Sequence, residues 1–148
     1  MPTFFLRYEG EAAPSGPWRT GDRVTRDDDG FLYFEGRNDD VIISAGYRIG
    51  PFEVESACLE HAAVREAAAV ASPDELRGNI VKAFIVLAEE YNPSDELAQE
   101  IKRFVRERLS AYAYPREIEF VNDLPKTLTG KIRRIELRQR EGERAPSA

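Results

Sequence analysis

Residues 36–55 read GRNDDVIISAGYRIGPFEVE, and their pattern predicts a hairpin followed by a helix. The β-branched run at 41–43 predicts a strand, and the glycines that flank residues 47–49 predict the second arm of a hairpin. Pro51 suits the first position of a helix, because proline lacks an N–H that would be unpaired there anyway. We therefore expect a helix over residues 52–60, directly after the hairpin.

Strands are also predicted on both sides of this stretch. Residues 23–26 and 31–35 are predicted to be two short strands, because the intervening Asp-Asp-Asp-Gly sequence is a strong turn signal. Downstream, residues 64–71 form a short apolar run that Ser-Pro-Asp at 72–74 is expected to end. Residues 80–87 are rich in β-branched and aromatic side chains, which predicts a central strand.

Helical spacing returns in the second half of the chain. Apolar residues at 97, 101, 104, 105 and 109 predict an amphipathic helix over 94–110. An extended segment is expected near 118–124 and a last helix over 133–141. The fold class is therefore α+β: a small sandwich of helices packed on a mixed sheet of about three strands, preceded by a short hairpin and a hinge.

Composition excludes several classes of protein. The chain has 148 residues, with 27 acidic and 21 basic side chains and a net charge of -6. This balance argues against nucleic acid as a partner. The longest apolar run, residues 83–88, is too short for a membrane span, and the first residues do not form a signal peptide. The single cysteine, Cys58, excludes an internal disulfide and fits the cytoplasm.

Two side chains on the first predicted helix have an ordinary structural interpretation. Cys58 shares the apolar face with Val54 and Ala57, so we expect it in the core. His61 is expected to cap the helix or to pack beside it, and we assign it no chemistry.

A glycine-bearing loop at residues 125–131, PKTLTGK, is the first candidate site. It differs from a Walker phosphate loop, because Pro125 stands where a glycine is needed and Ile132 where serine or threonine is needed. Either Lys126 or Lys131 could still deliver an ammonium to a phosphate. A solvated turn without function is the alternative.

Two further candidates involve carboxylates and arginines. Asp22, beside a glycine turn, could accept two hydrogen bonds from a ribose diol, although a capped turn has the same sequence. Arg37 and Arg48 stand between glycines, and a guanidinium binds phosphate through two parallel hydrogen bonds. Alternatively, the two arginines form surface ion pairs with Asp39 or Asp40, which contribute little to stability.

Three elements together resemble a known family: TGD at 20–22, GR-x-DD with GYRI-x-P-x-E-x-E over 36–55, and PKT-x-x-GK-I-x-R over 125–134. In this order they resemble the carboxyl-terminal domain of adenylate-forming enzymes. That superfamily includes acyl-CoA synthetases, peptide-synthetase adenylation domains and firefly luciferase. The resemblance covers residues 18–140. Segments 44–56, 114–116 and 124–127 look closest to medium-chain and aromatic acyl-CoA synthetases.

The resemblance implies a reaction in two halves. Such enzymes join a carboxylate to ATP, giving an acyl-adenylate and pyrophosphate. The small domain then rotates, and coenzyme A attacks the adenylate to give a thioester and AMP. ATP, coenzyme A and Mg²⁺ are therefore the expected cofactors, with the magnesium ligands outside this chain.

The resemblance also implies a role for individual residues. Lys131 matches the adenylation lysine, and Asp39 matches the hinge, where the backbone absorbs the domain rotation. Residues matching the ATP and AMP site are Asp22, Arg37 and Arg48. Residues matching the coenzyme A site are Gly46, Tyr47, Arg77, Arg106, Tyr114 and Arg116. Ala45 departs from the family, in which close relatives usually carry serine. Arg77 in a loop and Arg106 on a helix face could equally be ordinary surface residues.

The resemblance finally implies a division of the chain. Residues 1–38 are expected to be the end of a large N-terminal adenylation domain, 39–141 a C-terminal lid domain and 142–148 a flexible tail. The missing N-terminal domain and a small carboxylic acid are the expected partners. By itself the fragment should neither activate nor select an acid. The alternatives are a non-catalytic module that binds a nucleotide or coenzyme A, and an adenylation domain that loads a carrier protein.

Overall fold

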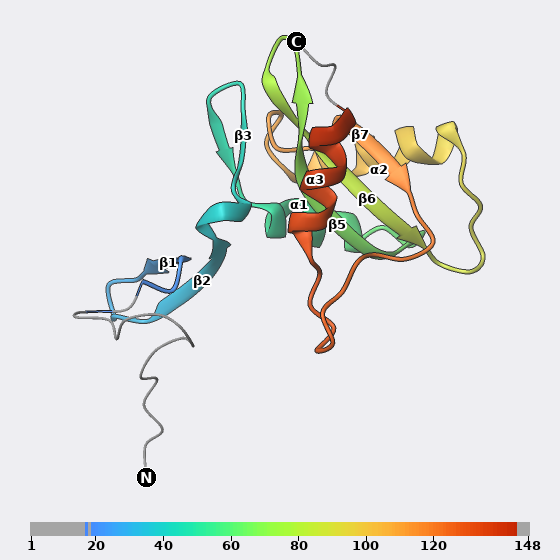
Figure 1. The fold of residues 1–148 in the computed structure, drawn as a ribbon. Coiled ribbons are helices and arrows are strands. Elements are labelled where there is room, and N and C mark those ends of the chain that lie inside the picture. The colour runs from blue at the N-terminus through green and yellow to red at the C-terminus, as the bar shows by residue number, and fades with distance from the viewer. Residues whose placement is uncertain (1–16, 18, 145–148) are drawn as a thin grey trace.

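The computed structural model describes residue 17 and residues 19–144. Figure 1 shows their arrangement. The elements are, in chain order, β1 (Asp22–Arg26), β2 (Leu32–Arg37), the 3-10 turn η1 (Asn38–Asp40), β3 (Ile42–Ser44), β4 (Tyr47–Ile49), α1 (Pro51–Leu59), β5 (Val64–Asp74), β6 (Gly78–Leu87), α2 (Asp95–Arg108), β7 (Glu117–Phe120) and α3 (Arg134–Arg144).

The central sheet has the order β5-β6-β7. β6 pairs with β5 antiparallel and with β7 parallel. This confirms the predicted α+β class with a mixed sheet of three strands. The two predicted hairpins are also present, as the β1–β2 and β3–β4 pairs. β1 and β2 lie apart from the sheet, beyond η1 (Figure 1).

Helices cover both faces of the sheet. Along β6, Val81, Ala83 and Ile85 belong to a core cluster shared with α1 and α2. The alternate residues Phe84 and Val86 belong to a second cluster, completed by α3. Because successive side chains of a strand point to opposite faces, a strand buried on both faces is apolar throughout. This explains why residues 80–87 form a nearly continuous apolar run.

Two predicted boundaries are wrong. β5 does not end at residues 72–74, because Ser72, Pro73 and Asp74 still pair with β6. β5 is an edge strand, so the missing N–H of Pro73 need not cost a hydrogen bond of the sheet. α3 continues to Arg144, three residues beyond its predicted end. Ser94, by contrast, caps α2 where the sequence predicted its start, accepting a hydrogen bond from Leu97 N at 3.1 Å.

A lysine lies fully buried at the centre of the sheet. Lys82 Nζ lies 2.9 Å from a carboxylate oxygen of Glu117, 2.9 Å from Glu119 and 3.0 Å from Glu141. Burial lowers the pKa of Lys82, but hydrogen bonds to the three glutamates outweigh burial and raise it above its usual value. This charged cluster joins β6, β7 and α3 inside the domain.

Cys58 is also fully buried, as predicted. Burial, and then the nearby charge of Glu55, raises the pKa of the Cys58 thiol to about 12. The thiolate is the reactive form, so the native chain should not react with a thiol reagent such as DTNB at pH 8. We expect one thiol to react after unfolding in denaturant. Rapid modification of the native chain would contradict this placement.

His61 packs beside the end of α1, as expected. Its Nδ1 accepts a hydrogen bond from Ala63 N at 3.2 Å. Its ring meets the Phe104 ring edge-on, with the centroids 4.9 Å apart. These contacts give His61 a structural role between α1 and α2.

Candidate functional site

The loop that carries Lys131 is a small closed structure ahead of α3. Lys126 and Ile132 form an antiparallel bridge across its base. Thr127 N donates to Lys131 O at 2.8 Å, and Lys131 N donates to Thr127 Oγ1 at 3.0 Å. Gly130 has φ +82°, which side chains rarely adopt, so this turn favours glycine. The loop projects from the domain below α3 in Figure 1.

The two lysines of this loop differ in their surroundings. Lys126 Nζ lies 2.8 Å from Glu66 and 3.0 Å from Asp123, and hydrogen bonds to these carboxylates raise its pKa. The Lys131 ammonium is exposed, and within residues 17 and 19–144 it has no ion pair or side-chain hydrogen bond. Lys126 therefore fixes the loop, whereas Lys131 is free to contact a ligand.

Asp22, Arg37 and Asp39 form a cluster where β1 and β2 meet η1. Arg37 donates to Asp39 Oδ2 at 3.2 Å, and its other nitrogen lies 3.9 Å from Asp22 Oδ1. The hydrogen bond from Arg37 holds the pKa of Asp39 below its usual value. The surface pairing considered for Arg37 is therefore present.

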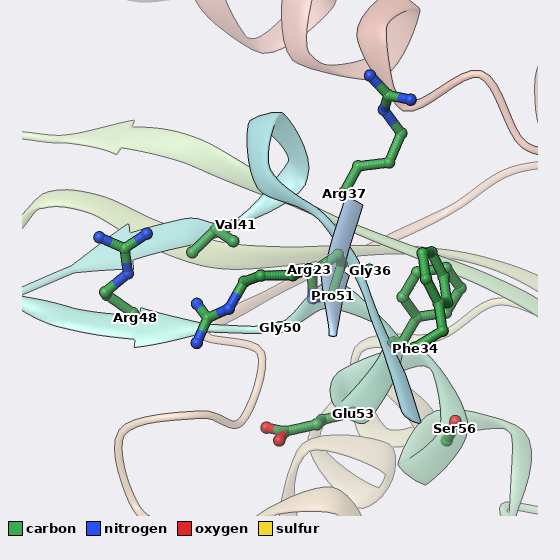
Figure 2. A pocket seen from close by; sticks show the side chains of 11 residues that line it. Arg23, Phe34, Gly36, Arg37, Val41, Arg48, Gly50, Pro51, Glu53 and Ser56 are labelled. Carbon is green, nitrogen blue, oxygen red and sulfur yellow. The ribbon is translucent and has the colours of Figure 1, made fainter. Parts of the chain in front are cut away.

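Arg37 and Arg48 do not converge on one point. Both line a cavity of about 450 Å³, together with Arg23, Phe34 and Phe52 among others. Figure 2 shows the guanidinium groups of Arg23 and Arg48 on one side of this cavity, whereas Arg37 extends away from them. In this arrangement Arg37 and Arg48 therefore do not bind one phosphate together.

The turn between β3 and β4 forms a second candidate surface. Ala45 and Gly46 have φ values of 48° and 83°, as a tight two-residue hairpin turn requires. Among the described residues, no heavy atom outside Gly46 and its two chain neighbours lies within 4 Å of the position that a Cβ on Gly46 would occupy. The Tyr47 ring stacks on Tyr112, with centroids 4.3 Å apart and planes at 7°. The turn thus presents open backbone beside a flat aromatic pair.

Two small cavities join this turn to α2. The first, of about 240 Å³, is lined by Tyr47, Arg77, Tyr112 and Arg116 among others. The second, of about 220 Å³, is lined by Gln99, Lys102, Arg103, Arg106, Tyr114 and Arg116. Arg116 lines both cavities, so the two form adjacent parts of one surface, which we call the basic groove.

Tyr114 lies between two arginines of the basic groove. The Arg106 guanidinium lies 5.4 Å and the Arg116 guanidinium 5.0 Å from the centre of its ring. The structure thus brings together Arg106, Tyr114 and Arg116, which are distant in sequence from Arg77 and Tyr47 at the other end of the groove. A net charge of -6 for the chain therefore coexists with a local cluster of cations.

Sequence reasoning missed two cations and one aromatic residue of the basic groove, as well as smaller lining residues. Lys102 and Arg103 line the same cavity as Arg106. Their spacing, one helical turn before Arg106, could have indicated a shared face of the predicted helix. Tyr112 had no comparable signal, because its stacking on Tyr47 joins segments 65 positions apart in the chain.

The two candidate surfaces lie at opposite ends of the small domain. In Figure 1 the Lys131 loop projects at one end, and the turn between β3 and β4 lies at the other. Among the described residues there is no helix long and apolar enough to cross a membrane. They also contain no group of three or more His, Cys, Asp or Glu that could hold a metal ion.

Comparison with known proteins gives a family match. Residues 53–131, more than half of the chain, match the model of the AMP-binding enzyme C-terminal domain. The 4-hydroxybutyrate–CoA ligase 1 of Metallosphaera sedula is 56% identical over 145 residues, covering 95% of this chain and 26% of the relative. Acyl-coenzyme A synthetase ACSM4, mitochondrial, of Rattus norvegicus is 59% identical over 128 residues, covering 85% of this chain and 22% of the relative.

A solved structure supports the same match. The crystal structure of Brucella canis acyl-CoA synthetase superposes with a TM-score of 0.71 and 53% identity, covering 91% of this chain and 26% of that protein. The chain thus spans about a quarter of the length of the curated relatives that it matches.

Proposed function

The chain belongs to the AMP-binding enzyme C-terminal domain family, and we propose that it is the mobile C-terminal domain of an AMP-forming acyl-CoA synthetase. The complete enzyme activates a carboxylic acid as an acyl-adenylate with ATP and then forms acyl-CoA. One observation carries this proposal: the loop of residues 125–131, which holds the exposed Lys131, and the β3–β4 turn, which borders the basic groove, lie at opposite ends of one small domain (Figure 1). Such a domain suits two half-reactions that need each end in turn.

In the first half-reaction, Lys131 serves as the catalytic residue. Its ammonium bridges the attacking carboxylate and the α-phosphate of ATP, where negative charge grows in the transition state. The absence of a competing carboxylate partner among the described residues supports this role. The ion pairs of Lys126 with Glu66 and Asp123 keep the loop in place.

Asp22, Arg37 and Arg48 serve the nucleotide in this proposal. The Asp22 carboxylate accepts hydrogen bonds from the ribose hydroxyls. Arg37, 3.9 Å from Asp22, lies close enough to orient that carboxylate and to approach the neighbouring phosphate. Arg48 lies on the other side of the cavity in Figure 2 and so contacts a different part of the nucleotide.

In the second half-reaction, the turn between β3 and β4 guides coenzyme A. The open space over Gly46 lets the thin pantetheine chain pass close to the backbone. Tyr47, stacked on Tyr112, forms a flat wall beside it. Arg77, Arg106 and Arg116 bind the phosphates, and the Tyr114 ring offers a face for adenine. Lys102 and Arg103 extend the same cation cluster.

The basic groove favours free coenzyme A over a carrier protein as the thiol substrate. Both carry the thiol on a phosphopantetheine arm, but only coenzyme A has the adenosine 3′-phosphate at the far end. A carrier protein would leave the cations around Tyr114 without a partner.

The acid itself is a small carboxylic acid, and the residues that would select it lie outside this chain. A lone unpaired Cys58 is consistent with a reducing compartment, and we propose the cytoplasm.

A substitution in α2 tests the coenzyme A site. Arg106→Ala in the full-length synthetase should raise KM for coenzyme A by about tenfold, because one charge-assisted phosphate contact is lost. KM for ATP should stay unchanged. Arg108→Ala is the matched control, since Arg108 lies on the same helix but pairs with Glu60 at 2.9 Å and lies outside the groove. Equal changes for the two variants would contradict the assignment.

The proposed function itself is tested by restoring the large domain. The chain joined to an N-terminal adenylation domain of its own protein should release pyrophosphate with some short, medium-chain or aromatic acid and form the corresponding acyl-CoA. The 148-residue chain alone should do neither. If the full-length protein makes no acyl-adenylate from any such acid, the enzyme interpretation fails and a binding module becomes the better description.

A further inference from the structure

Two arginines of α3 contact, from one side, η1 (Asn38–Asp40), which holds the expected hinge position Asp39 and which we call the hinge region. Arg138 donates through one nitrogen to the backbone oxygen of Asp39 at 2.9 Å and to Asp40 Oδ1 at 2.5 Å. Arg134 lies 3.6 Å from the other oxygen of Asp40. The side chains of Asp40 and Arg134 are about nine-tenths buried, at 10% and 11% exposure. The contacts are therefore shielded more than ordinary surface ion pairs.

The opposite side of the hinge region is held by β1 and β2. Asn38 N donates to the backbone oxygen of Gly21 at 2.8 Å. The Asp39 side chain accepts from Arg37, the last residue of β2, at 3.2 Å. The backbone up to Asn38 N is thus attached to the β1–β2 hairpin, whereas the Asp39 carbonyl and Asp40 are attached to α3.

We propose that Arg134, Arg138 and Asp40 form a hinge clamp, which confines rotation of the small domain to the backbone torsions of Asn38 and Asp39. The Asn38 N–H is fixed to the β1–β2 hairpin, and the Asp39 carbonyl is fixed to α3. If both of these parts move as rigid bodies, only the backbone torsions between the two groups can change. The three residues act as positioning residues. The inference rests on the proposed function only in taking Asp39 as the point of rotation.

The hinge clamp also connects the hinge to the catalytic lysine. Arg134 is the first residue of α3 and follows the Lys131 loop directly. Its guanidinium donates to both oxygens of Glu55 on α1, at 2.9 and 2.6 Å. Lys131, α1, α3 and Asp40 therefore belong to one rigid part, so that rotation at Asp39 moves the lysine by a defined arc.

Relaxation measurements on the 148-residue chain test the hinge clamp directly. In the wild type, the backbone amides of Asp40 and Val41 should have ¹⁵N order parameters like those of α3, about 0.85. In Arg138→Met, which keeps the apolar stem but has no donor, they should fall toward about 0.6. Asp40→Asn should act in the same direction, and Arg138→Lys should restore most of the order. Arg133→Met is the control, because the Arg133 side chain pairs with Glu136 on the surface.

Kinetics of the full-length protein supply a second readout. Arg138→Met should lower kcat of both half-reactions by about tenfold with KM for ATP and coenzyme A nearly unchanged, because a loose hinge misplaces either end of the domain. If wild-type Asp40 is already as mobile as a free loop, or if Arg138→Met matches Arg133→Met in both readouts, the hinge clamp is wrong. Ordered Asp40 in a protein without synthetase activity would instead refute the proposed function alone.

Discussion

Lys131→Ala in the full-length synthetase should reduce the rate of acyl-adenylate formation by about 10²–10³-fold. Removing one preorganised donor to a developing negative charge typically has an effect of this size. Thioester formation from acyl-adenylate supplied from outside should continue at nearly the wild-type rate. The physical reason is that the loop carrying Lys131 lies at one end of the domain, and the β3–β4 turn that borders the basic groove lies at the other (Figure 1). Rapid-quench measurement of each half-reaction checks both expectations.

Lys126→Ala is the matched control for this experiment. It removes the same charge from the same loop, but Lys126 already pairs with Glu66 and Asp123. We expect adenylation to fall by less than about tenfold, through a looser loop rather than through lost chemistry. Equal loss of both half-reactions in Lys131→Ala would refute the role of this lysine. So would a larger effect of the Lys126 substitution.

The second large effect concerns stability. Lys82→Met should lower the free energy of unfolding by about 3 kcal/mol, because removing one partner of a buried ion pair leaves an uncompensated buried charge. The most deeply buried of the three carboxylate partners of Lys82 is Glu141, whose side chain is only 2% exposed. Urea denaturation of the 148-residue chain measures the change. Adding Glu141→Gln to Lys82→Met should recover part of the loss, and two fully additive effects would contradict direct coupling.

The difference in the free energy of unfolding between wild type and Lys82→Met should depend on pH in a definite direction. The glutamates raise the pKa of Lys82 in the folded chain above the ordinary value of 10.5. The folded state therefore holds the proton more tightly than the unfolded state. The stabilisation is complete below pH 10.5 and is lost as the pH rises from there through the pKa of the folded state. The difference in the free energy of unfolding between wild type and Lys82→Met should therefore narrow in that alkaline range.

The sequence predicted most of the fold because its elements follow simple periodicities. Apolar spacing placed α2, and turn residues placed both hairpins. Pro73 misled the prediction, since whether proline is tolerated depends on which strand lies at the edge of the sheet. Lys82 gave no signal either, because its partners Glu117, Glu119 and Glu141 come from segments that meet only in the folded domain.

The candidate site was predicted less completely than the fold, because several of its contacts join segments that are distant in the sequence. The motif resemblance singled out Arg106, Tyr114 and Arg116, which the fold does bring together. It also assigned Arg37 and Arg48 to the ATP and AMP site; in the structure Arg37 pairs with Asp39 and extends away from Arg48 (Figure 2). The hinge clamp was beyond reach, because Arg138 and Asp40 are 98 positions apart. Contacts between distant segments leave no periodic pattern in one sequence.

The proposal that the domain uses its two ends in successive half-reactions can be tested directly in the full-length protein. Both half-reactions are measured for Lys131→Ala and for Gly46→Leu. The leucine side chain would occupy the open space over the β3–β4 turn, where we place pantetheine. We expect each variant to lose a different half-reaction: the rate of adenylation falls in Lys131→Ala, and the rate of thioester formation falls in Gly46→Leu. Loss of the same half-reaction in both variants would contradict the proposal that each end of the domain serves a different half-reaction.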